Sequence, residues 1–313
     1  MPTSLAIIIV NWNAGKQLRD CLDSIVSTSR NGFTLARVVV VDNASTDGSL
    51  EGLESLSLPL HIIRNSENRG FAAACNQGAA VCDADYLLFL NPDTKLFTGS
   101  LAVPVAFMED TANQDVGICG IQLVDEHGRV ARTCANFPTL GRFAAQATGI
   151  DKIPGLRGAG VHMAAWDHLE TRAVDHVIGA FFFIRQGLFA AMQGFDERFF
   201  VYLEDVDLSF RTAQSGWRSV YLTETQAFHL GGGTSLQVKA RRLFYSLQSR
   251  LLYAFKHFPR WQARILTVIT LLIEPLSRTL FSLLRGGVQD MRNTWRGYGM
   301  LYRELPKILK GQK

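Results

Sequence analysis

Two acidic motifs follow apolar runs and could bind a metal diphosphate and activate a hydroxyl group. The first, Asn91-Pro92-Asp93, follows residues 86–90, and the second, Glu204-Asp205, follows residues 199–203. If each run is a buried strand, its carboxylate lies at the rim where open α/β sheets bind ligands. His229 adds an imidazole farther along the chain. These residues supply the parts for chemistry on a phosphorylated substrate.

A metal ion is the first role that these residues predict. Mg²⁺ or Mn²⁺ needs carboxylate oxygen and keeps coordination positions for substrate phosphates, so Asp93 is the natural ligand. His229 is a candidate second ligand, and the glycine run 231–233 beside it would let the backbone approach a diphosphate. A turn at Asp93 and a structural histidine are the alternatives.

A general base is the second role. Glu204, Asp205 and Asp207 place three carboxylates within four positions, and their repulsion raises the pKa of at least one of them. A raised pKa suits a base that removes a proton from a hydroxyl group. Acidic residues in the first turn of a helix are the structural alternative, because they favour the helix dipole.

Two earlier apolar runs end in residues that could bind a nucleotide. Val10, Asn11 and Asn13 end the first run and form its turn, where a nucleotide would enter. Asp42 ends the second run, and its carboxylate can accept hydrogen bonds from a base or ribose. An N-cap or turn is the alternative for this aspartate. Neither GxGxxG nor a P-loop pattern follows the first run, so an NAD-dependent enzyme lacks its main support.

Residues 68–78 are a further candidate phosphate-binding segment. Asn68 and Gly70 open a predicted helix whose N-terminus offers free amide groups, and Arg69 is available for a phosphate. Asn76 is expected on a nearby turn. A closely packed structural helix is the alternative, since residues 72–74 are all alanine.

The elements that must position these residues alternate as in doubly wound α/β folds. Strands are expected at residues 5–10, 38–41, 61–63, 86–90, 116–124, 130–135, 177–185 and 218–222. Helices are expected at residues 16–29, 49–56, 70–80, 186–193 and 206–215. Residues 140–172 are expected to be partly looped and could shape an acceptor pocket.

Composition favours a reduced cytosolic protein. Of the 313 residues, 47% are hydrophobic, which allows a full core and argues against global disorder. The five cysteines show no CxxC spacing, so a zinc site is not expected. The N-terminus has no basic region before its first apolar run, so no signal peptide is expected.

Charge divides the chain into two parts. Residues 239–313 contain 15 Lys/Arg and 3 Asp/Glu, whereas residues 1–238 contain 17 and 25. The sequence therefore predicts a catalytic domain, 1–238, and a basic amphipathic helical extension, 239–313. Nucleic acid and anionic lipid are both candidates for an anionic surface that the extension meets.

The extension favours lipid over nucleic acid. Residues 243–258 carry several aromatic residues together with Arg250 and Lys256, as in helices that lie in a membrane interface. The apolar run 265–273 has nine residues, and a spanning helix needs about 20, so it is not expected to cross. A helical cap on the catalytic domain is the alternative, and both can hold.

With these residues in place, the chain resembles the inverting glycosyltransferases of family 2, and within them the rhamnosyltransferase group. The matching stretches are residues 8–13, 40–49, 68–71 with Asn76, 91–93, 194–200, 204–207 and His229. The resemblance implies the GT-A fold, a Rossmann-like mixed α/β sheet that binds a nucleotide-diphospho-sugar, here with a C-terminal helical extension.

The resemblance also implies roles at the matched positions. Asp42 would bind the nucleobase, Asp93 would bind the metal as the last acid of the family's DxD motif, and His229 would help to hold the metal or diphosphate. Asp205 would be the base. The usual first acid of DxD is Asn91 here, so metal binding depends more on Asp93 and His229.

Asn-Pro-Asp is familiar in rhamnosyl and galactofuranosyl members, which favours dTDP-rhamnose over a UDP-sugar as donor. A glycan or polyprenyl-diphosphate-linked acceptor is expected, at the cytoplasmic face of the cell membrane, in surface polysaccharide assembly. A catalytically inactive nucleotide-sugar-binding scaffold recruited to membranes is the alternative function.

Overall fold

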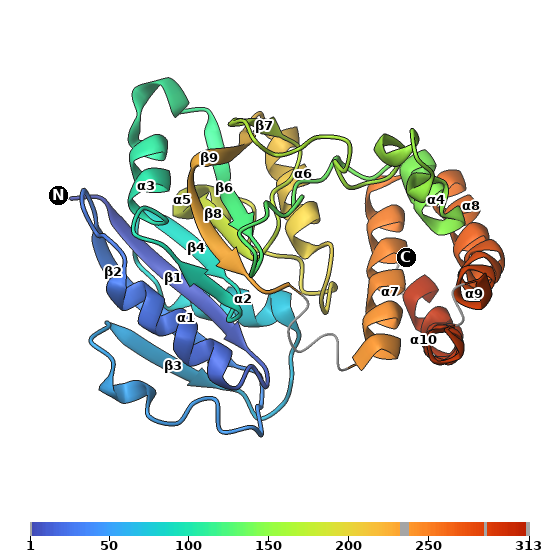
Figure 1. The fold of residues 1–313 in the computed structure, drawn as a ribbon, viewed down its shortest axis with the longest axis horizontal. Helices are drawn as coiled ribbons and strands as arrows, with labels where there is room; N and C mark the ends of the chain where they lie inside the picture. The colour runs from blue at the N-terminus through green and yellow to red at the C-terminus, as the bar shows by residue number, and fades with distance from the viewer. Residues whose placement is uncertain (1, 232–237, 285–286, 311–313) are drawn as a thin grey trace. The chain divides into compact units, whose positions relative to one another are not determined.

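The computed structural model describes residues 2–231, 238–284 and 287–310 (Figure 1). The chain divides into two compact units. The first comprises residues 1–135, 166–197 and 204–234, and the second comprises residues 136–165, 198–203 and 235–313. The predicted extension 239–313 thus belongs to a unit that also contains two earlier segments.

The first unit is built on one mixed sheet, which has nine strands within the described residues. The strands are β1 (Ser4–Asn11), β2 (Thr34–Asp42), β3 (Leu60–Arg64), β4 (Tyr86–Leu90), β5 (Thr94–Leu96), β6 (Val116–Val124), β7 (Arg172–Val174), β8 (Phe181–Arg185) and β9 (Arg218–His229). Their order is β3-β2-β1-β4-β8-β6-β9-β5, and β7 pairs with β9.

Strand direction brings the predicted site to one edge of this sheet. β1 pairs parallel with β2 and β4, so their carboxyl ends lie together. β8 runs antiparallel to β4 and starts at the same edge. β6 runs antiparallel to β8, and β9 runs parallel to β6, so β9 ends there too.

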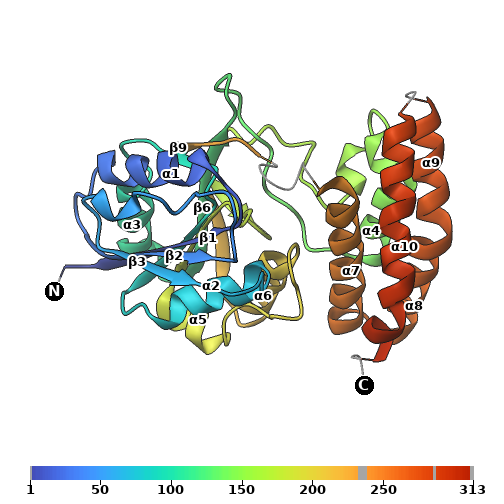
Figure 2. The same ribbon diagram turned by 90° about the horizontal axis from the view of Figure 1, so that it is seen from below.

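Helices cover both faces of the sheet (Figure 2). On one face lie α1 (Lys16–Ser27) and α3 (Ala102–Glu109), and on the other lie α2 (Phe71–Ala80), α5 (Gln186–Ala191) and α6 (Glu204–Gln214). Gly78 allows α2 to approach β1 closely, since a Cβ at this position would lie 2.5 Å from Cγ2 of Ile8.

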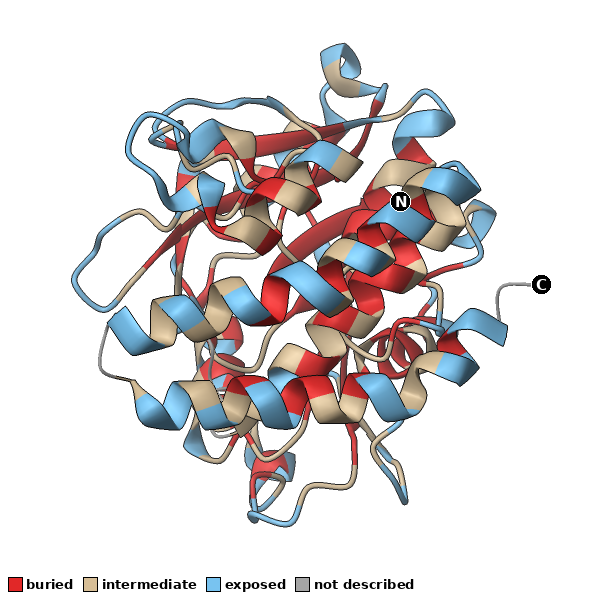
Figure 3. Ribbon diagram, turned by 90° about the vertical axis from the view of Figure 1, so that its right-hand side faces the viewer, coloured by how far each residue is buried: buried red, intermediate tan, exposed pale blue. Residues whose placement is uncertain are grey.

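The second unit is helical. It contains α4 (Leu140–Thr148), α7 (Lys239–His257), α8 (Arg260–Val268), the π-helical η6 (Ile269–Ile273), α9 (Glu274–Leu284) and α10 (Val288–Lys310). Its core joins Phe244, Leu247 and Leu251 of α7 to Tyr298 and Leu301 of α10. Figure 3 shows exposed positions recurring along the long helices of this unit.

α8, η6 and α9 form one continuous helix, Arg260–Leu284, called the 260–284 helix below. It has 25 residues and is long and apolar enough to cross a membrane, although 22% of its apolar window is buried inside the protein. The predicted apolar run, 265–273, is therefore shorter than the apolar helix, which continues past Glu274 to Leu284.

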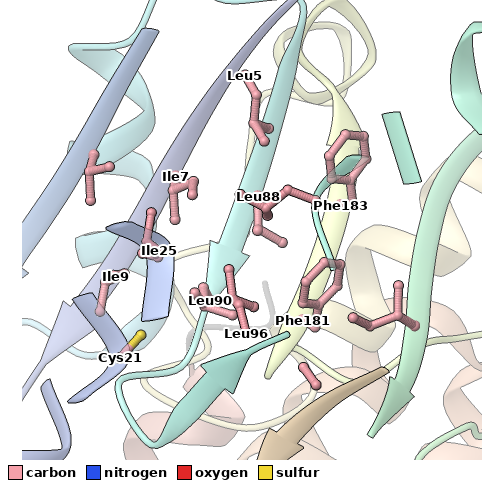
Figure 4. Close-up of a cluster of buried hydrophobic side chains, with 14 of the residues drawn as sticks. Leu5, Ile7, Ile9, Cys21, Ile25, Leu88, Leu90, Leu96, Phe181 and Phe183 are labelled. Atoms are coloured by element: carbon pink, nitrogen blue, oxygen red, sulfur yellow. The ribbon is translucent and has the colours of Figure 1, made fainter. Parts of the chain in front are cut away.

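The core of the first unit explains why its strands are nearly continuous apolar runs. Alternate residues of β1, Leu5, Ile7 and Ile9, point toward α1, where they meet Cys21 and Ile25 (Figure 4). Strands covered on both faces need apolar residues at every position. This pattern confirms the α/β class that the sequence predicted.

Several predicted elements differ from the structure. Residues 130–135 make only isolated bridges, and within 49–56 only the short 3₁₀ helix Leu53–Ser55 forms. Residues 199–203 were expected to be a strand but form a bend, with positive φ at Tyr202 and Leu203. Ser249 Oγ of α7 donates a hydrogen bond to the Val201 carbonyl oxygen, which occupies a group that a sheet would use.

Candidate active site

Strand pairing brings Asp93 and His229 together. Thr94 of β5 lies opposite His229 of β9, and the Leu230 N–H donates to the Asp93 carbonyl oxygen at 3.2 Å. Nε2 of His229 lies 3.3 Å from Oδ1 of Asp93, and both side chains are about nine-tenths buried. Among the described residues this Nε2 has no hydrogen-bond partner.

A buried imidazole nitrogen that lies next to a carboxylate and accepts or donates no hydrogen bond within the described part of the chain fits a metal-binding role. The described residues contain no cluster of three or more His, Cys, Asp or Glu side chains arranged for a metal. Mn²⁺ and Mg²⁺ usually keep positions for phosphate and water, so two protein ligands suit an ion that binds with a diphosphate. Gly232 and Gly233 of the predicted glycine run lie outside the described residues.

Asp205 lies in the first turn of α6 and is held from three sides. Its Oδ2 accepts a hydrogen bond from the Gly179 N–H at 2.8 Å, and its Oδ1 accepts one from the Val206 N–H at 2.8 Å. Nε2 of His176 lies 3.1 Å from Oδ2. The side chain of His176 is almost completely buried, and the sequence analysis did not single out this residue.

The environments of Glu204 and Asp205 push their pKa values apart. Burial raises the pKa of Glu204 well above its ordinary value, and the charge of Asp205 adds to this. Burial also acts to raise the pKa of Asp205, but His176 and the hydrogen bonds from Gly179 and Val206 outweigh it, so this pKa is lowered. Burial and the charge of Asp205 thus favour the protonated form of Glu204, whereas His176 and the two N–H donors favour the ionised form of Asp205.

One turn contacts both halves of the site. Ala180 accepts a hydrogen bond from the Asn91 N–H at 3.0 Å, and the adjacent Gly179 donates to Asp205. A Cβ on Gly179 would lie 3.1 Å from the Asp205 carboxylate, so glycine allows this close approach. The structure thus joins the loop of Asp93 to Asp205 through two successive residues.

The predicted nucleotide residues at β1 and β2 form a buried polar network. Asn11 is fully buried, and its Nδ2 donates to Oδ1 of Asp42 at 2.7 Å and to the Ser49 hydroxyl at 2.8 Å. Oδ2 of Asp42 accepts from the Ser45 N–H at 3.1 Å. Asn13 Oδ1 accepts from the Thr46 N–H, and Val10 is buried beneath the turn. Asn11 therefore orients Asp42, whose remaining lone pairs are the available acceptors.

The loop before α2 joins this network through Asn43, which the sequence interpretation missed. Asn43 Nδ2 donates to the Gly70 carbonyl oxygen at 3.0 Å, and the Gly70 N–H donates to Oδ1 of Asn68 at 2.9 Å. Gly70 has a φ of 86° at the N-cap of α2, a conformation that favours glycine. Arg69 is exposed.

Asn76 lies inside α2 and not on a turn as expected. Its Nδ2 donates to the Phe195 carbonyl oxygen at 2.9 Å and to Glu197 at 3.0 Å, and its Oδ1 accepts from the Phe195 N–H at 2.9 Å. These bonds fix the segment that leads toward Glu204.

Asn43 and Gly179 carried a weak signal, since one follows Asp42 directly and the other precedes a strand. His176 carried none, because its partner is 29 positions away.

The fold is similar to that of solved GT-A structures. A mannosyltransferase from Pyrobaculum calidifontis, solved with GDP-Man and Mn²⁺, matches with a TM-score of 0.54 and 17% identity over 100% of this chain and 90% of that one. Residues 1–349 of TarS from S. aureus match with a TM-score of 0.52 and 16% identity, over 96% and 92%. GalNAc-T7, solved with UDP, GalNAc and Mn²⁺, matches at 0.54 and 16%, over 73% and 43%.

Proteins that match by sequence indicate which kind of glycosyltransferase this chain is similar to. The glycosyl transferase family 2 model matches residues 6–158. The N-acetylglucosaminyl-diphospho-decaprenol L-rhamnosyltransferase of Mycobacterium tuberculosis is 27% identical over 279 residues, 84% of this chain and 88% of its own length. Rhamnosyltransferase WbbL of Escherichia coli is 27% identical over 176 residues, 55% and 62% of the two lengths. These matches support a family 2 glycosyltransferase that is rhamnosyltransferase-like.

Proposed function

We propose that the protein transfers rhamnose from dTDP-rhamnose, with inversion, to a lipid-linked glycan during surface polysaccharide assembly. The observation that carries this proposal is the turn at Gly179 and Ala180, which bonds both to the loop of Asp93 and to Asp205. A diphosphate site and a proton acceptor that are joined by one turn match the needs of a displacement at an anomeric carbon.

The mechanism assigns a task to each side of the turn. Asp93 and His229 bind the donor's diphosphate side and would hold a divalent metal, which supplies charge neutralisation for the departing diphosphate. Asp205 accepts the proton of the acceptor hydroxyl. The acceptor oxygen forms a bond to the anomeric carbon as the bond to the diphosphate breaks, and the nucleoside diphosphate leaves with the electron pair. One displacement from the opposite face inverts the configuration.

The remaining predicted residues would bind the nucleotide and sugar. Asp42, oriented by Asn11, accepts from the base, and Asn13 shapes the turn beside it. Asn68, Arg69 and Gly70 meet the donor at the start of α2, where Arg69 offers an exposed guanidinium. Val10 and Asn91 support these loops, and Asn76 acts through the segment that it fixes.

The relatives support a proposal for the acceptor and the location. The name of the M. tuberculosis relative specifies an N-acetylglucosaminyl-diphospho-decaprenol, so we infer an acceptor of that class, a sugar on a polyprenyl diphosphate. We propose, on this basis, a location at the inner face of the cell membrane, where the basic residues of 239–313 would meet anionic lipid. A nucleic-acid partner is not part of the proposal.

Product analysis tests the reaction directly. The purified protein is incubated with Mn²⁺, an N-acetylglucosaminyl-diphospho-polyprenol and either dTDP-rhamnose, UDP-galactofuranose or a UDP-hexose. We expect a rhamnosylated product of inverted configuration. Asp205→Asn should lower turnover by about 10²–10⁴-fold with donor binding intact, whereas Asp23→Asn, the same change on an exposed carboxylate of α1, should not. Near-normal turnover in Asp205→Asn would refute the base assignment.

The inactive scaffold is the alternative function, and none of the relatives described above is named as one. A thermal-shift panel of nucleotide sugars with Mn²⁺ separates the two. Stabilisation by dTDP-rhamnose without transfer or hydrolysis would favour the scaffold.

A further inference from the structure

The 260–284 helix exposes a line of large apolar side chains along its whole length. Their exposed fractions range from 42% to 74%, far above those of core residues. The nine residues are Trp261, Ile265, Val268, Leu272, Ile273, Leu276, Leu280, Leu283 and Leu284. A contiguous apolar surface of this kind marks an interaction site.

The π segment keeps this line on one face. Val268, Leu272, Leu276 and Leu280 are each four positions apart, and in an unbroken α-helix of 3.6 residues per turn they would drift around the axis. A π turn takes one more residue per hydrogen-bonded turn. Because η6 spans Ile269–Ile273, it reverses much of the drift. The irregularity therefore straightens an apolar stripe.

The opposite face of the helix is packed and charged. Ala263, Leu266, Thr270 and Glu274 are fully buried. Glu274 forms ion pairs with Arg250 of α7 and with Arg278 one turn later. A helix that spans a bilayer must tolerate lipid over much of its circumference, and this one has a single apolar face. It resembles an amphipathic helix that lies in the interface plane.

The charges around the stripe point to an anionic surface. All three acids of residues 239–313 are already engaged: Glu274 as above, Asp290 with Lys239, and Glu304 with Lys307. Exposed arginines remain, among them Arg260 and Arg264 beside Trp261 and Ile265. Basic residues near an anionic leaflet strengthen binding.

α10 extends this surface. Its exposed apolar residues recur at every seventh position, at Val288, Trp295, Tyr302 and Leu309. A basic residue directly follows each of the last three. The Tyr302 hydroxyl donates to the Leu271 carbonyl oxygen of η6 at 2.7 Å, so the α10 line meets the π segment. Figure 3 shows both helices with exposed positions along them.

We propose that the apolar face of the 260–284 helix inserts into the surface of an anionic bilayer and lies parallel to it, and does not cross it. The proposal deepens the membrane location given above and rests on the proposed function for that location. Binding is measured without donor or acceptor, so its failure would leave the transferase assignment untouched.

Vesicle flotation of the full chain tests insertion. Leu272→Gln, Leu276→Gln and Leu280→Gln are combined, since glutamine preserves helix propensity and all three positions are exposed. Binding to phosphatidylglycerol-containing vesicles should fall at least about tenfold. The matched control combines Val26→Gln, Val81→Gln and Leu169→Gln, exposed apolar positions of the first unit, and should float as wild type. Equal flotation of both variants would overturn the proposal.

The depth of labelled positions in the bilayer distinguishes a helix that lies in the membrane plane from one that crosses the membrane. The five native cysteines are buried, so a new cysteine can be labelled selectively. A fluorophore at Ile265→Cys, Leu272→Cys or Leu283→Cys should be quenched equally by lipids brominated at one shallow depth. Deepest quenching at position 272, with shallow positions at both ends, would show crossing and refute the in-plane arrangement.

A second copy of the chain is the competing occupant. A wild-type dimer in solution that becomes a monomer in the triple-glutamine variant, with flotation unchanged, would identify the stripe as a dimer interface and reject the lipid assignment.

Discussion

At the scale of single residues, His176 controls the acidity of the proposed base. Its Nε2 lies 3.1 Å from Asp205, and it lowers the pKa of that carboxyl against the opposing effect of burial. His176→Asn removes this interaction, so the pKa of Asp205 rises. The proposed mechanism requires ionised Asp205, and we therefore expect the acidic limb of the kcat/KM profile to move to higher pH. His61→Asn, at an exposed position of β3, is the control and should leave the profile in place.

Glu204 gives a stability prediction with a definite sign. Its pKa in the folded protein lies well above 4.5, so above this pH the unfolded chain releases a proton that the folded chain keeps. The free energy of unfolding of the wild type therefore loses a contribution as pH rises. Glu204→Gln cannot ionise, and its Tm relative to wild type should increase from pH 4.5 upward. Glu67→Gln, at an exposed position, is the matched control. A difference in Tm between Glu204→Gln and wild type that stays constant with pH would contradict the raised pKa of Glu204.

The sequence predicted the acids of the site and not the groups that tune them. Asp93, Asp205 and His229 were singled out because carboxylates after apolar runs and a histidine beside a glycine run are local patterns. The Asn91 N–H meets the Ala180 carbonyl oxygen next to the pairing of β4 with β8, and His176 and Gly179 meet Asp205 at the start of α6. Such contacts produce no recognisable pattern of residue spacing in the sequence.

At the scale of elements, the approach of α2 to β1 depends on Gly78. A Cβ there would lie 2.5 Å from Ile8 and 3.2 Å from Val41, on two neighbouring strands. Gly78→Ala should therefore destabilise the protein by about 1–3 kcal/mol through overpacking. Gly299→Ala, in α10 with open space at its Cβ, should be neutral or stabilising. Urea unfolding compares the two, and equal stabilities would show that α2 can shift.

The buried ion pair of Glu274 with Arg250 fastens the 260–284 helix to α7. Glu274→Ala would leave the buried Arg250 guanidinium without its main partner and should cost about 3–5 kcal/mol. Replacing both residues, Arg250→Met with Glu274→Leu, should restore much of this loss, since neither charge then remains buried. Thermal unfolding of the single and double variants measures it. A single variant as stable as wild type would show that the pair is dispensable.

Two element predictions failed because local pattern does not report packing. Residues 199–203 are as apolar as the strands of the sheet, yet they form a bend. The ring of Phe200 stacks on that of Tyr245 of α7, with the ring centroids 4.6 Å apart. The apolar run 265–273 was ended at Glu274 because a charge normally ends an apolar segment. Two arginines neutralise that charge, and the helix continues for ten more residues to Leu284.

At the scale of the whole molecule, the charge split of the sequence corresponds only approximately to the two units. The basic helices share their unit with α4 and with residues 198–203. Arg250 of α7 contacts Gln146 of α4, and the Ser277 hydroxyl donates to the Ala147 carbonyl oxygen. Deleting residues 239–313 would therefore expose the packed face of α4 as well as remove the membrane surface. Point substitutions on the exposed stripe are the cleaner test of membrane binding.

The two units should respond to different ligands in one hydrogen-exchange experiment on the full chain. dTDP-rhamnose with Mn²⁺ should protect the amides around Asn11, Asp42, Gly70, Asn91 and Gly179, because these lie on the loops of the proposed site. Anionic vesicles should instead protect the 260–284 helix, whose apolar face is exposed without lipid. Asp93→Asn should weaken the first response and leave the second intact, since only the first depends on the diphosphate side of the site. Protection of the helix by nucleotide sugar alone, or loss of both responses in this variant, would contradict the separation of the two functions.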